Sequence, residues 1–172
     1  MTGRQQRLKQ DFGRMQQLRD LNRGAVDFTS DYSNPPVHYR VTFRCAGVRL
    51  KDGRRVPVDH HEVDIFLGPK YPDEEPVFQW RTPIVHPNIL GQGVCPGVVG
   101  HWDAVTIPLD KVVVRLWDMA RYRLYNVDSV LDPDEAQWAR RNGQSLPCDK
   151  KELVEVPFAI APDQLPEIKI IG

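Results

Sequence analysis

The chain has 172 residues, of which 41% are hydrophobic and 27% are charged. That length suits one domain with a single hydrophobic core, and the composition is ordinary for a globular protein rather than a disordered one. Lys plus Arg equals Asp plus Glu at 23 each, so no net positive charge attracts the chain to nucleic acid or to an anionic membrane. We therefore expect neither nucleic acid nor a membrane as a partner.

The start of the chain and its cysteines predict a cytoplasmic protein with reduced thiols. Residues 1–18 are polar and lack the apolar stretch of a secretion signal, and no apolar run approaches the roughly 20 residues that span a bilayer. The three cysteines, Cys45, Cys95 and Cys148, are odd in number and far apart in the sequence. A disulfide framework is therefore not expected.

A helix followed by an antiparallel meander is predicted for the first half of the chain. Over residues 4–21, apolar side chains recur at helical spacing, which predicts an amphipathic helix. Residues 36–45 and 61–67 alternate apolar and polar side chains, and residues 76–80 form another short apolar segment, so we expect three or more strands. Cys45 falls in the apolar set of the first strand and is predicted to lie in the core.

Two helices are predicted after the strands. Over residues 108–124 six apolar side chains fall on one helical face, which predicts a well-buried helix. Residues 132–142 open with Asp132 as a helix N-cap, Pro133 at the first helical position and Glu135 three residues after the cap, which is the pattern of a capping box. Helices collected after an antiparallel sheet predict the α+β fold class.

The end of the chain is predicted to be an extension, residues 146–172, that follows a domain of residues 1–145. The stretch from 153 to 172 contains apolar residues, but its three prolines argue against a central strand. Three outcomes are open for this tail: an added edge strand, docking in a groove, or a mobile end.

The segment between the strands and the later helices carries the candidate chemistry. It reads "IVHPNILGQGVCPGVVGHW" and places Asn88 seven residues before Cys95, and Cys95 seven residues before Trp102. A cysteine thiolate accepts an acyl group well, and the resulting thioester stays reactive toward amines. A positioned amide such as that of Asn88 can stabilise the oxyanion of acyl transfer, by about 3 to 4 kcal/mol for one donor. Gly and Pro around the cysteine indicate an irregular, accessible loop.

Other interpretations of this segment stay open. Cys95 can be a buried hydrophobic residue, which is the usual fate of a free cysteine. A zinc site from His86, Cys95 and His101, with His60 or His61, would need ligands whose spacing matches no compact pair. A thiol hydrolase would need a histidine base beside Cys95, for which His101 is the nearby candidate in the sequence.

The motifs "GPKYPDEEPVFQW", "VHPNILGQGVC" and the following Trp resemble those of the ubiquitin-conjugating enzymes, the E2 family. The likeness covers residues 4–142. Its most specific part is a combination of eight residues: Tyr71, Pro72, Pro76, His86, Pro87, Asn88, Cys95 and Trp102. The resemblance implies the UBC fold, with an N-terminal helix, an antiparallel sheet, a cysteine-bearing loop and two C-terminal helices, here followed by an irregular tail.

The resemblance also implies a function and its residues. Cys95 would accept a ubiquitin-like modifier protein from an ATP-dependent E1 enzyme as a thioester and pass it to a lysine of a target protein. Asn88 would support the oxyanion and Asp128 would orient the incoming amine, with no cofactor and no metal. His86, Pro87 and Trp102 would be structural. The first helix and two loops would face E1 or a ligase, through Arg7, Arg14, Tyr71 and Val105.

The chain also departs from the commonest E2 pattern. The interval from the His-Pro-Asn motif to the cysteine is one residue shorter, Pro96 replaces the usual Leu, and a proline-rich tail replaces the last long helix. These features look more like the compact E2 proteins of bacterial ubiquitination-like antiphage operons, of the Bil or the CBASS type, and we favour the first. The competing class is a non-catalytic E2 variant that only binds a ubiquitin-like protein.

Overall fold

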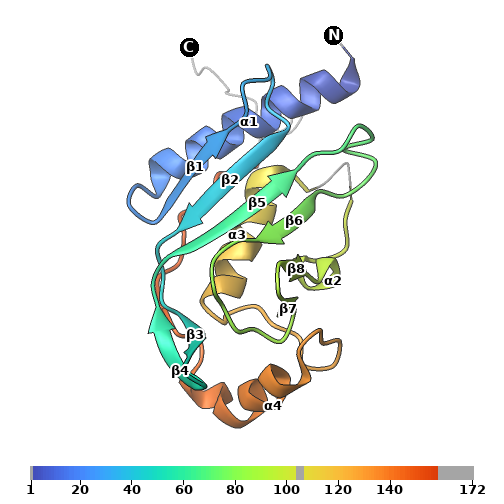
Figure 1. Ribbon diagram of the computed structural model, residues 1–172. Helices are drawn as coiled ribbons and strands as arrows, with labels where there is room; N and C mark the ends of the chain where they lie inside the picture. Colours follow the sequence, from blue (N-terminus) through green and yellow to red (C-terminus); the bar gives the residue numbers. More distant parts are fainter. Residues whose placement is uncertain (1, 104–106, 159–172) are drawn as a thin grey trace, which may run out of the picture.

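The computed structural model describes residues 2–103 and 107–158. A six-stranded antiparallel sheet with the strand order β1-β2-β5-β6-β8-β7 forms its centre (Figure 1). Its strands are β1 (Val26–Ser30), β2 (His38–Phe43), β5 (His61–Phe66), β6 (Val77–Trp80), β7 (Ile89–Leu90) and β8 (Gly93–Val94). The hairpin of β3 (Gly47–Lys51) and β4 (Arg54–Val58) forms a separate two-stranded sheet.

Four helices and a short 3-10 turn accompany the sheet in the described residues. They are α1 (Gly3–Leu21), α2 (Pro96–Val99), α3 (Leu109–Ala120), α4 (Pro133–Asn142) and the turn η1 (Gly143–Ser145). The order of an N-terminal helix, an antiparallel sheet and later helices confirms the α+β prediction. The predicted second helix is shorter than expected, because the chain leaves the helical conformation at Arg121 and Tyr122 has a φ of 60°.

The core lies between the sheet and α3, which crosses behind the strands in Figure 1. The inward residues of β2 and β5 are fully buried, as is the apolar face of α3 with Leu109, Val113 and Leu116. Trp117 of α3 packs edge-on against Phe43 of β2, with the ring centroids 5.9 Å apart. The six-residue apolar stripe predicted for α3 therefore does face the core, as its helical spacing indicated.

Asp11 of α1 joins three parts of this core. Its carboxylate is fully buried and accepts hydrogen bonds from the Tyr71 hydroxyl at 2.5 Å, from Nε of Arg7 at 2.8 Å and from the backbone N–H of Leu109 at 2.9 Å. Leu109 is the first residue of α3, so the carboxylate also lies at the positive end of that helix. The polar network fixes α1 against both α3 and the loop that carries Tyr71.

The N-cap predicted for α4 forms as expected, but the full capping box does not. Asp132 accepts hydrogen bonds from the backbone N–H groups of Asp134 and Glu135. The Glu135 side chain is buried; it turns away from the cap and forms an ion pair at 2.6 Å with Arg55 of β4, which is partly exposed. The backbone N–H of Asp132, which a capping box would satisfy, donates to the carbonyl of Pro87 instead.

The described part of the tail docks between α1 and α3. Asn22, at the end of α1, donates to the carbonyl of Val154 and accepts from its N–H, both at 2.8 Å. Arg14 donates to the carbonyls of Val156 and Pro157, and the Val156 side chain is buried. Of the three outcomes left open by the sequence, docking in a groove is the one that residues up to 158 adopt; residues 159–172 lie outside the described part.

Candidate functional site

The His-Pro-Asn motif forms a buried turn after β6, and His86 organises it. Nδ1 of His86 accepts a hydrogen bond from the backbone N–H of Asn88 at 3.0 Å, so Nε2 carries the proton and donates to the carbonyl of Leu124 at 3.1 Å. Burial lowers the pKa of His86 to about 4. The imidazole is therefore neutral near pH 7, and with both nitrogens bonded it has no electron pair left for a metal or for proton transfer.

Asn88 braces the loop of residues 124–131 that follows α3. The residue is fully buried, and its Nδ2 donates to the carbonyls of Asn126 at 2.9 Å and Ser129 at 2.7 Å. Its Oδ1 accepts from the backbone N–H of Asn126 at 2.8 Å. Both amide hydrogens are thus used in this structure. Support of an oxyanion by Asn88 requires one of these two bonds to be exchanged for a bond to the reacting oxygen.

Cys95 is connected to the same turn through its backbone. Its N–H donates to the carbonyl of Asn88 at 2.9 Å, and its own carbonyl accepts from Val98 in α2, which begins one residue later. The Cys95 residue is half-buried. By contrast Cys45 is buried, as predicted, and this burial raises the pKa of its thiol to about 12. Burial also raises the pKa of Cys148.

Asp128 lies on the loop that Asn88 braces, with its side chain 87% exposed. Asn126 shapes this loop by accepting hydrogen bonds with its Oδ1 from the backbone N–H groups of Asp128 and Ser129. Arg140 of α4 donates to the Asp128 carboxylate at 3.3 Å and to the carbonyl of Val127. Asn126 was not predicted from the sequence, although Asn in a polar segment after a helix favours an Asx turn, in which its side chain accepts from the N–H two residues later.

Trp102 and Tyr71 form an aromatic pair behind the cysteine segment, with centroids 5.7 Å apart. The indole N–H of Trp102 donates to the carbonyl of Pro72 at 2.7 Å, and the guanidinium of Arg7 lies over both rings. Tyr71 is 1% exposed. Its side chain therefore stabilises the loop from the core side and is not itself exposed to a partner at the surface.

The two arginines predicted to bind a partner make internal contacts. Arg7 pairs with Asp11 and donates to the carbonyl of Ile107 at 2.5 Å, and its side chain is 14% exposed. Arg14 forms a bidentate ion pair with Asp110, in which Nε and Nη2 donate to the two carboxylate oxygens at 2.5 and 2.9 Å. Both therefore contribute to the docking of α1. Val105, the fourth residue predicted for partner binding, lies outside the described residues.

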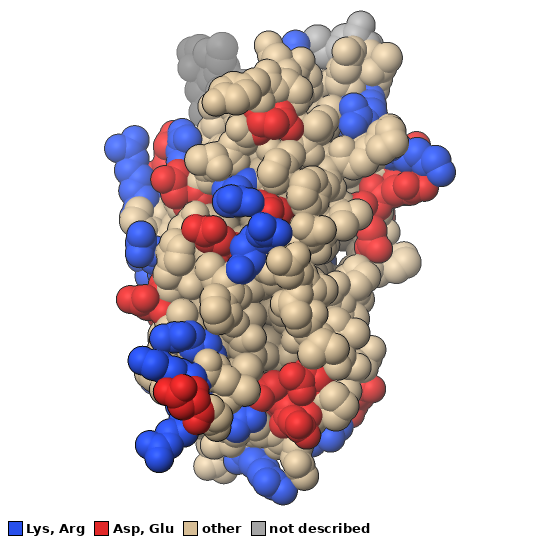
Figure 2. Space-filling view, in the orientation of Figure 1, with Lys and Arg blue, Asp and Glu red and all other residues tan. Residues whose placement is uncertain are grey.

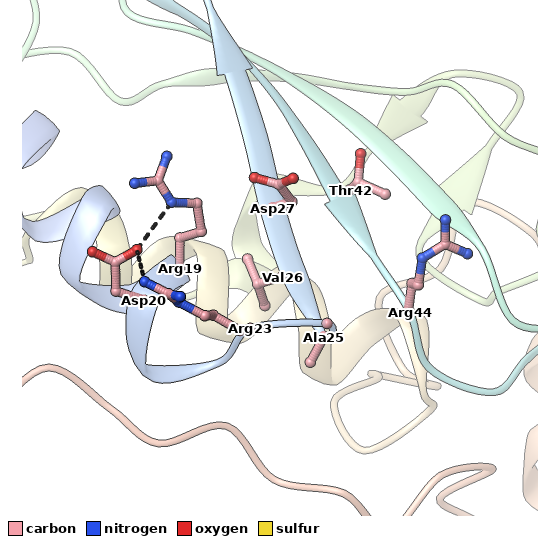
Figure 3. Close-up of a pocket in the computed structure, with 9 residues that line it drawn as sticks. Arg19, Asp20, Arg23, Ala25, Val26, Asp27, Thr42 and Arg44 are labelled. Carbon is pink, nitrogen blue, oxygen red and sulfur yellow. Dashed lines mark hydrogen bonds and ion pairs between the residues drawn. The ribbon is translucent and has the colours of Figure 1, made fainter.

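Two further features of the described surface lie apart from these residues. Figure 2 shows acidic and basic side chains interspersed on the face of the sheet opposite α3, without a broad area of one sign. A groove at the end of α1, drawn in Figure 3, is lined by residues of α1, β1, β2 and the adjoining turns, among them Arg19 of α1, Arg23 between α1 and β1, and Arg44 just after β2. It contains none of the described residues predicted for the site, so we place the candidate chemistry at Cys95.

The zinc alternative is not supported by the described residues. His86 has both nitrogens bonded, and His61 is buried with Nε2 on the carbonyl of Cys45. Within residues 2–103 and 107–158 no cluster of three or more His, Cys, Asp or Glu side chains is arranged to hold a metal ion. The same residues contain no helix with the length and apolar character needed to cross a membrane.

The two buried histidines predict an acid-sensitive fold. Burial lowers the pKa of His86 and of His61 to about 4, from an ordinary value of 6.5. Above pH 6.5 these imidazoles are mostly neutral in both the folded and the unfolded protein. As the pH falls from 6.5 toward 4, they bind protons in the unfolded protein but not in the folded one, so the free energy of unfolding decreases. The lowered pKa of each histidine should decrease the free energy of unfolding by about 2 kcal/mol between pH 7 and pH 5.

Urea denaturation at pH 7, 6 and 5 measures this loss directly. The variant His61→Gln should lose less stability between pH 7 and pH 5 than the wild type does, while His60→Gln, which changes a more exposed neighbour, should follow the wild-type curve. Equal unfolding free energies for the wild type at pH 7 and pH 5 would contradict the assignment of buried neutral imidazoles.

Comparisons with known proteins agree with this fold. No protein-family model matches the chain, and no curated protein matches it. Among solved structures, it is similar to one described as "Ubiquitin conjugating enzyme (putative) from Trypanosoma cruzi", with 16% sequence identity and a TM-score of 0.56. The match covers 81% of this chain and 92% of that one. At this identity the similarity shows that the two proteins share an E2-like fold.

Proposed function

We propose that the chain is an E2-type conjugating enzyme. Cys95 accepts a ubiquitin-like protein from an ATP-dependent E1 enzyme and transfers it to a lysine of a target protein. The observation that carries this proposal is the connection of a half-buried cysteine, through one backbone hydrogen bond, to a buried His-Pro-Asn turn on an E2-like fold. Through Asn88, the same turn is hydrogen-bonded to the loop that carries the exposed carboxylate of Asp128.

The reaction consists of two acyl transfers. In the first, the Cys95 thiolate attacks the thioester carbonyl on E1, a new C–S bond forms and the E1 thiolate leaves. In the second, the lysine amine attacks the same carbonyl, the Cys95 thiolate leaves and an isopeptide bond forms. The proton lost by the amine passes to Asp128 or to water. Asn88 supports the oxyanion in the second transfer after one of its N–H groups leaves its loop carbonyl.

The remaining predicted residues have structural roles: they hold the site and the neighbouring surface in place. His86 and Pro87 shape the turn, and Trp102 supports the segment after the cysteine. Arg7, Arg14 and Tyr71 hold α1 and its neighbouring loop, which we propose as the surface for E1 or a ligase, together with Val105. The departures from the common E2 pattern support a role in a bacterial antiphage operon, of the Bil type or the CBASS type, where residues 146–172 form a C-terminal extension of the domain 1–145.

The test is a charging assay. The purified protein is mixed with ATP and with the E1 and the ubiquitin-like protein encoded beside its gene, and the products are compared on non-reducing and reducing gels. We expect a larger species that a thiol reductant removes and that Cys95→Ala never forms. Cys148→Ala, which removes another partly buried thiol, serves as the control and should still be charged.

The second candidate function is a non-catalytic binding module. Such a module would have the same fold, and the ubiquitin-like modifier would bind equally well to the wild type and to Cys95→Ala. Absence of the reducible species, with E1 shown to carry its own thioester, would favour this alternative. Release of the modifier to water instead of lysine would favour a thiol hydrolase; His101, the base it would need, is exposed.

A further inference from the structure

We propose that Arg115 of α3 is a positioning residue for Cys95, acting through the short helix α2. The guanidinium Nη1 of Arg115 donates a hydrogen bond to the carbonyl of Val99, the last residue of α2. Cys95 immediately precedes that helix. The part of the proposal that concerns transfer rests on the proposed function, whereas the part that concerns the conformation of residues 95–100 does not.

The helix α2 depends on contacts from outside. It has four residues, Pro96–Val99, and a single turn is not stable alone because helix nucleation costs more than one hydrogen bond returns. At its start the N–H of Cys95 is held by the carbonyl of Asn88, and at its end the carbonyl of Val99 is held by Arg115. These two bonds fix the turn from opposite sides, with Cys95 at one end.

Gly100 provides a second, independent observation. Its φ is +111°, and a Cβ added there would lie 2.0 Å from Nη1 and 2.9 Å from Cζ of Arg115. The guanidinium thus occupies the space that a side chain at position 100 would need. Glycine serves here both for its backbone conformation and for the close approach of the arginine, so positions 100 and 115 form a matched pair.

The environment of Arg115 strengthens the contact. The side chain is half-buried and lines a small cavity behind the cysteine segment, together with Pro96, Val99, Gly100 and Trp102. A cation at the C-terminal end of a helix bonds an otherwise unsatisfied carbonyl and interacts favourably with the partial negative charge there. Because displacement of a reacting group by about 1 Å can cost about 100-fold in rate, a contact that fixes Cys95 should affect transfer.

The test uses Arg115→Ala, Arg115→Lys and Gly100→Ala, with Arg44→Ala, immediately after β2, as a matched control that removes an exposed arginine. The first measurement needs no partner protein. The alkylation of each cysteine by iodoacetamide is followed by mass spectrometry of its peptide, and hydrogen exchange is followed in residues 95–103. Buried Cys45 reports whether the whole fold has opened.

We expect Arg115→Ala and Gly100→Ala to raise the alkylation rate of Cys95 about tenfold and to speed exchange in α2, with Cys45 still protected. Arg115→Lys should restore much of the protection, because its ammonium can donate to the same carbonyl. The two alanine substitutions should also be less than additive in combination, since removal of the guanidinium frees the space for a Cβ at position 100.

The second measurement follows discharge of the charged protein to lysine. Arg115→Ala should lower the maximal rate about tenfold and leave the apparent KM for lysine unchanged, with partial rescue by Arg115→Lys. Wild-type alkylation and exchange in folded Arg115→Ala would overturn the proposal. If Arg115→Ala also exposes Cys45 to alkylation, the result for Arg115→Lys decides. A Cys95 alkylation rate equal to that of the wild type then supports the contact, and a tenfold faster rate overturns it. A wild type that never forms a thioester would refute the proposed function and leave the alkylation result valid.

Discussion

Replacing Asn88 by alanine should lower transfer from Cys95 to lysine by about 100- to 1000-fold while thioester charging survives. Charging exchanges one thioester for another between two thiolates of similar leaving ability, and we expect the attack of a lysine amine to be the step that depends on support of the oxyanion by this amide. The structure adds a second cause of the loss. The same amide holds the loop of residues 124–131 by three hydrogen bonds, to Asn126 and Ser129.

Loss of oxyanion support and loss of loop bracing can be distinguished in the protein without substrate, because only the second changes its stability. If the bracing matters, Asn88→Ala should lower the free energy of unfolding by about 1 to 3 kcal/mol, because two loop carbonyls and an N–H lose their hydrogen bonds to a fully buried amide. Hydrogen exchange at Asn126 should also become faster. Single-turnover discharge assays and urea denaturation measure both effects on the same preparations.

Ser129→Ala is the matched control for Asn88→Ala, since Asn88 contacts only the backbone carbonyl of Ser129. It should keep both the stability and the transfer rate. A variant Asn88→Ala that transfers as fast as the wild type would refute the oxyanion role, and wild-type stability and exchange in that variant would refute the bracing role. Normal stability and exchange with slow transfer would assign it to the oxyanion alone.

The fold was predictable from the sequence wherever one face of an element is buried. The helix α3 and the strands β2 and β5 have regular apolar periods because they face the core. The edge strand β1 was missed because it is short and largely exposed: its burial alternates, but only Val26 of its five residues is buried, so its apolar period is weak. The turn α2 was missed because four residues with Pro and Gly give no helical period.

The site was predictable only in its local part. Spacing along the chain brought Asn88 and Cys95 together, since both lie in one segment. The partners that define what His86 and Asn88 do are 38 to 41 residues further on, in the loop after α3. Likewise the sequence offered Arg14 as a surface residue, whereas it pairs with Asp110, 96 residues away. A pattern of charges does not reveal which of them meet in the fold.

The most destabilising single change should be Asp11→Ala in α1. The carboxylate is fully buried and accepts from Tyr71, Arg7 and Leu109. Its loss would remove the Asp11 carboxylate from the guanidinium of Arg7, which is 14% exposed, and would remove the shortest hydrogen bond of the Tyr71 hydroxyl. Removal of one partner from a buried ion pair costs about 3 to 5 kcal/mol, so we expect a loss of unfolding free energy in that range.

Urea denaturation of Asp11→Ala, Asp11→Asn and Asp20→Ala separates charge from position. Asp11→Asn keeps an oxygen for the N–H of Leu109 but loses the charge opposite Arg7, and so should lie between the wild type and Asp11→Ala. Asp20 is on the same helix and half-exposed, with its nearest arginine nitrogen at 3.3 Å, so Asp20→Ala should change stability by less than about 1 kcal/mol. Similar small losses for Asp11→Ala and Asp20→Ala would mean that α1 is held by its apolar face, through Leu8, Met15 and Leu18, and that the polar network adds only specificity.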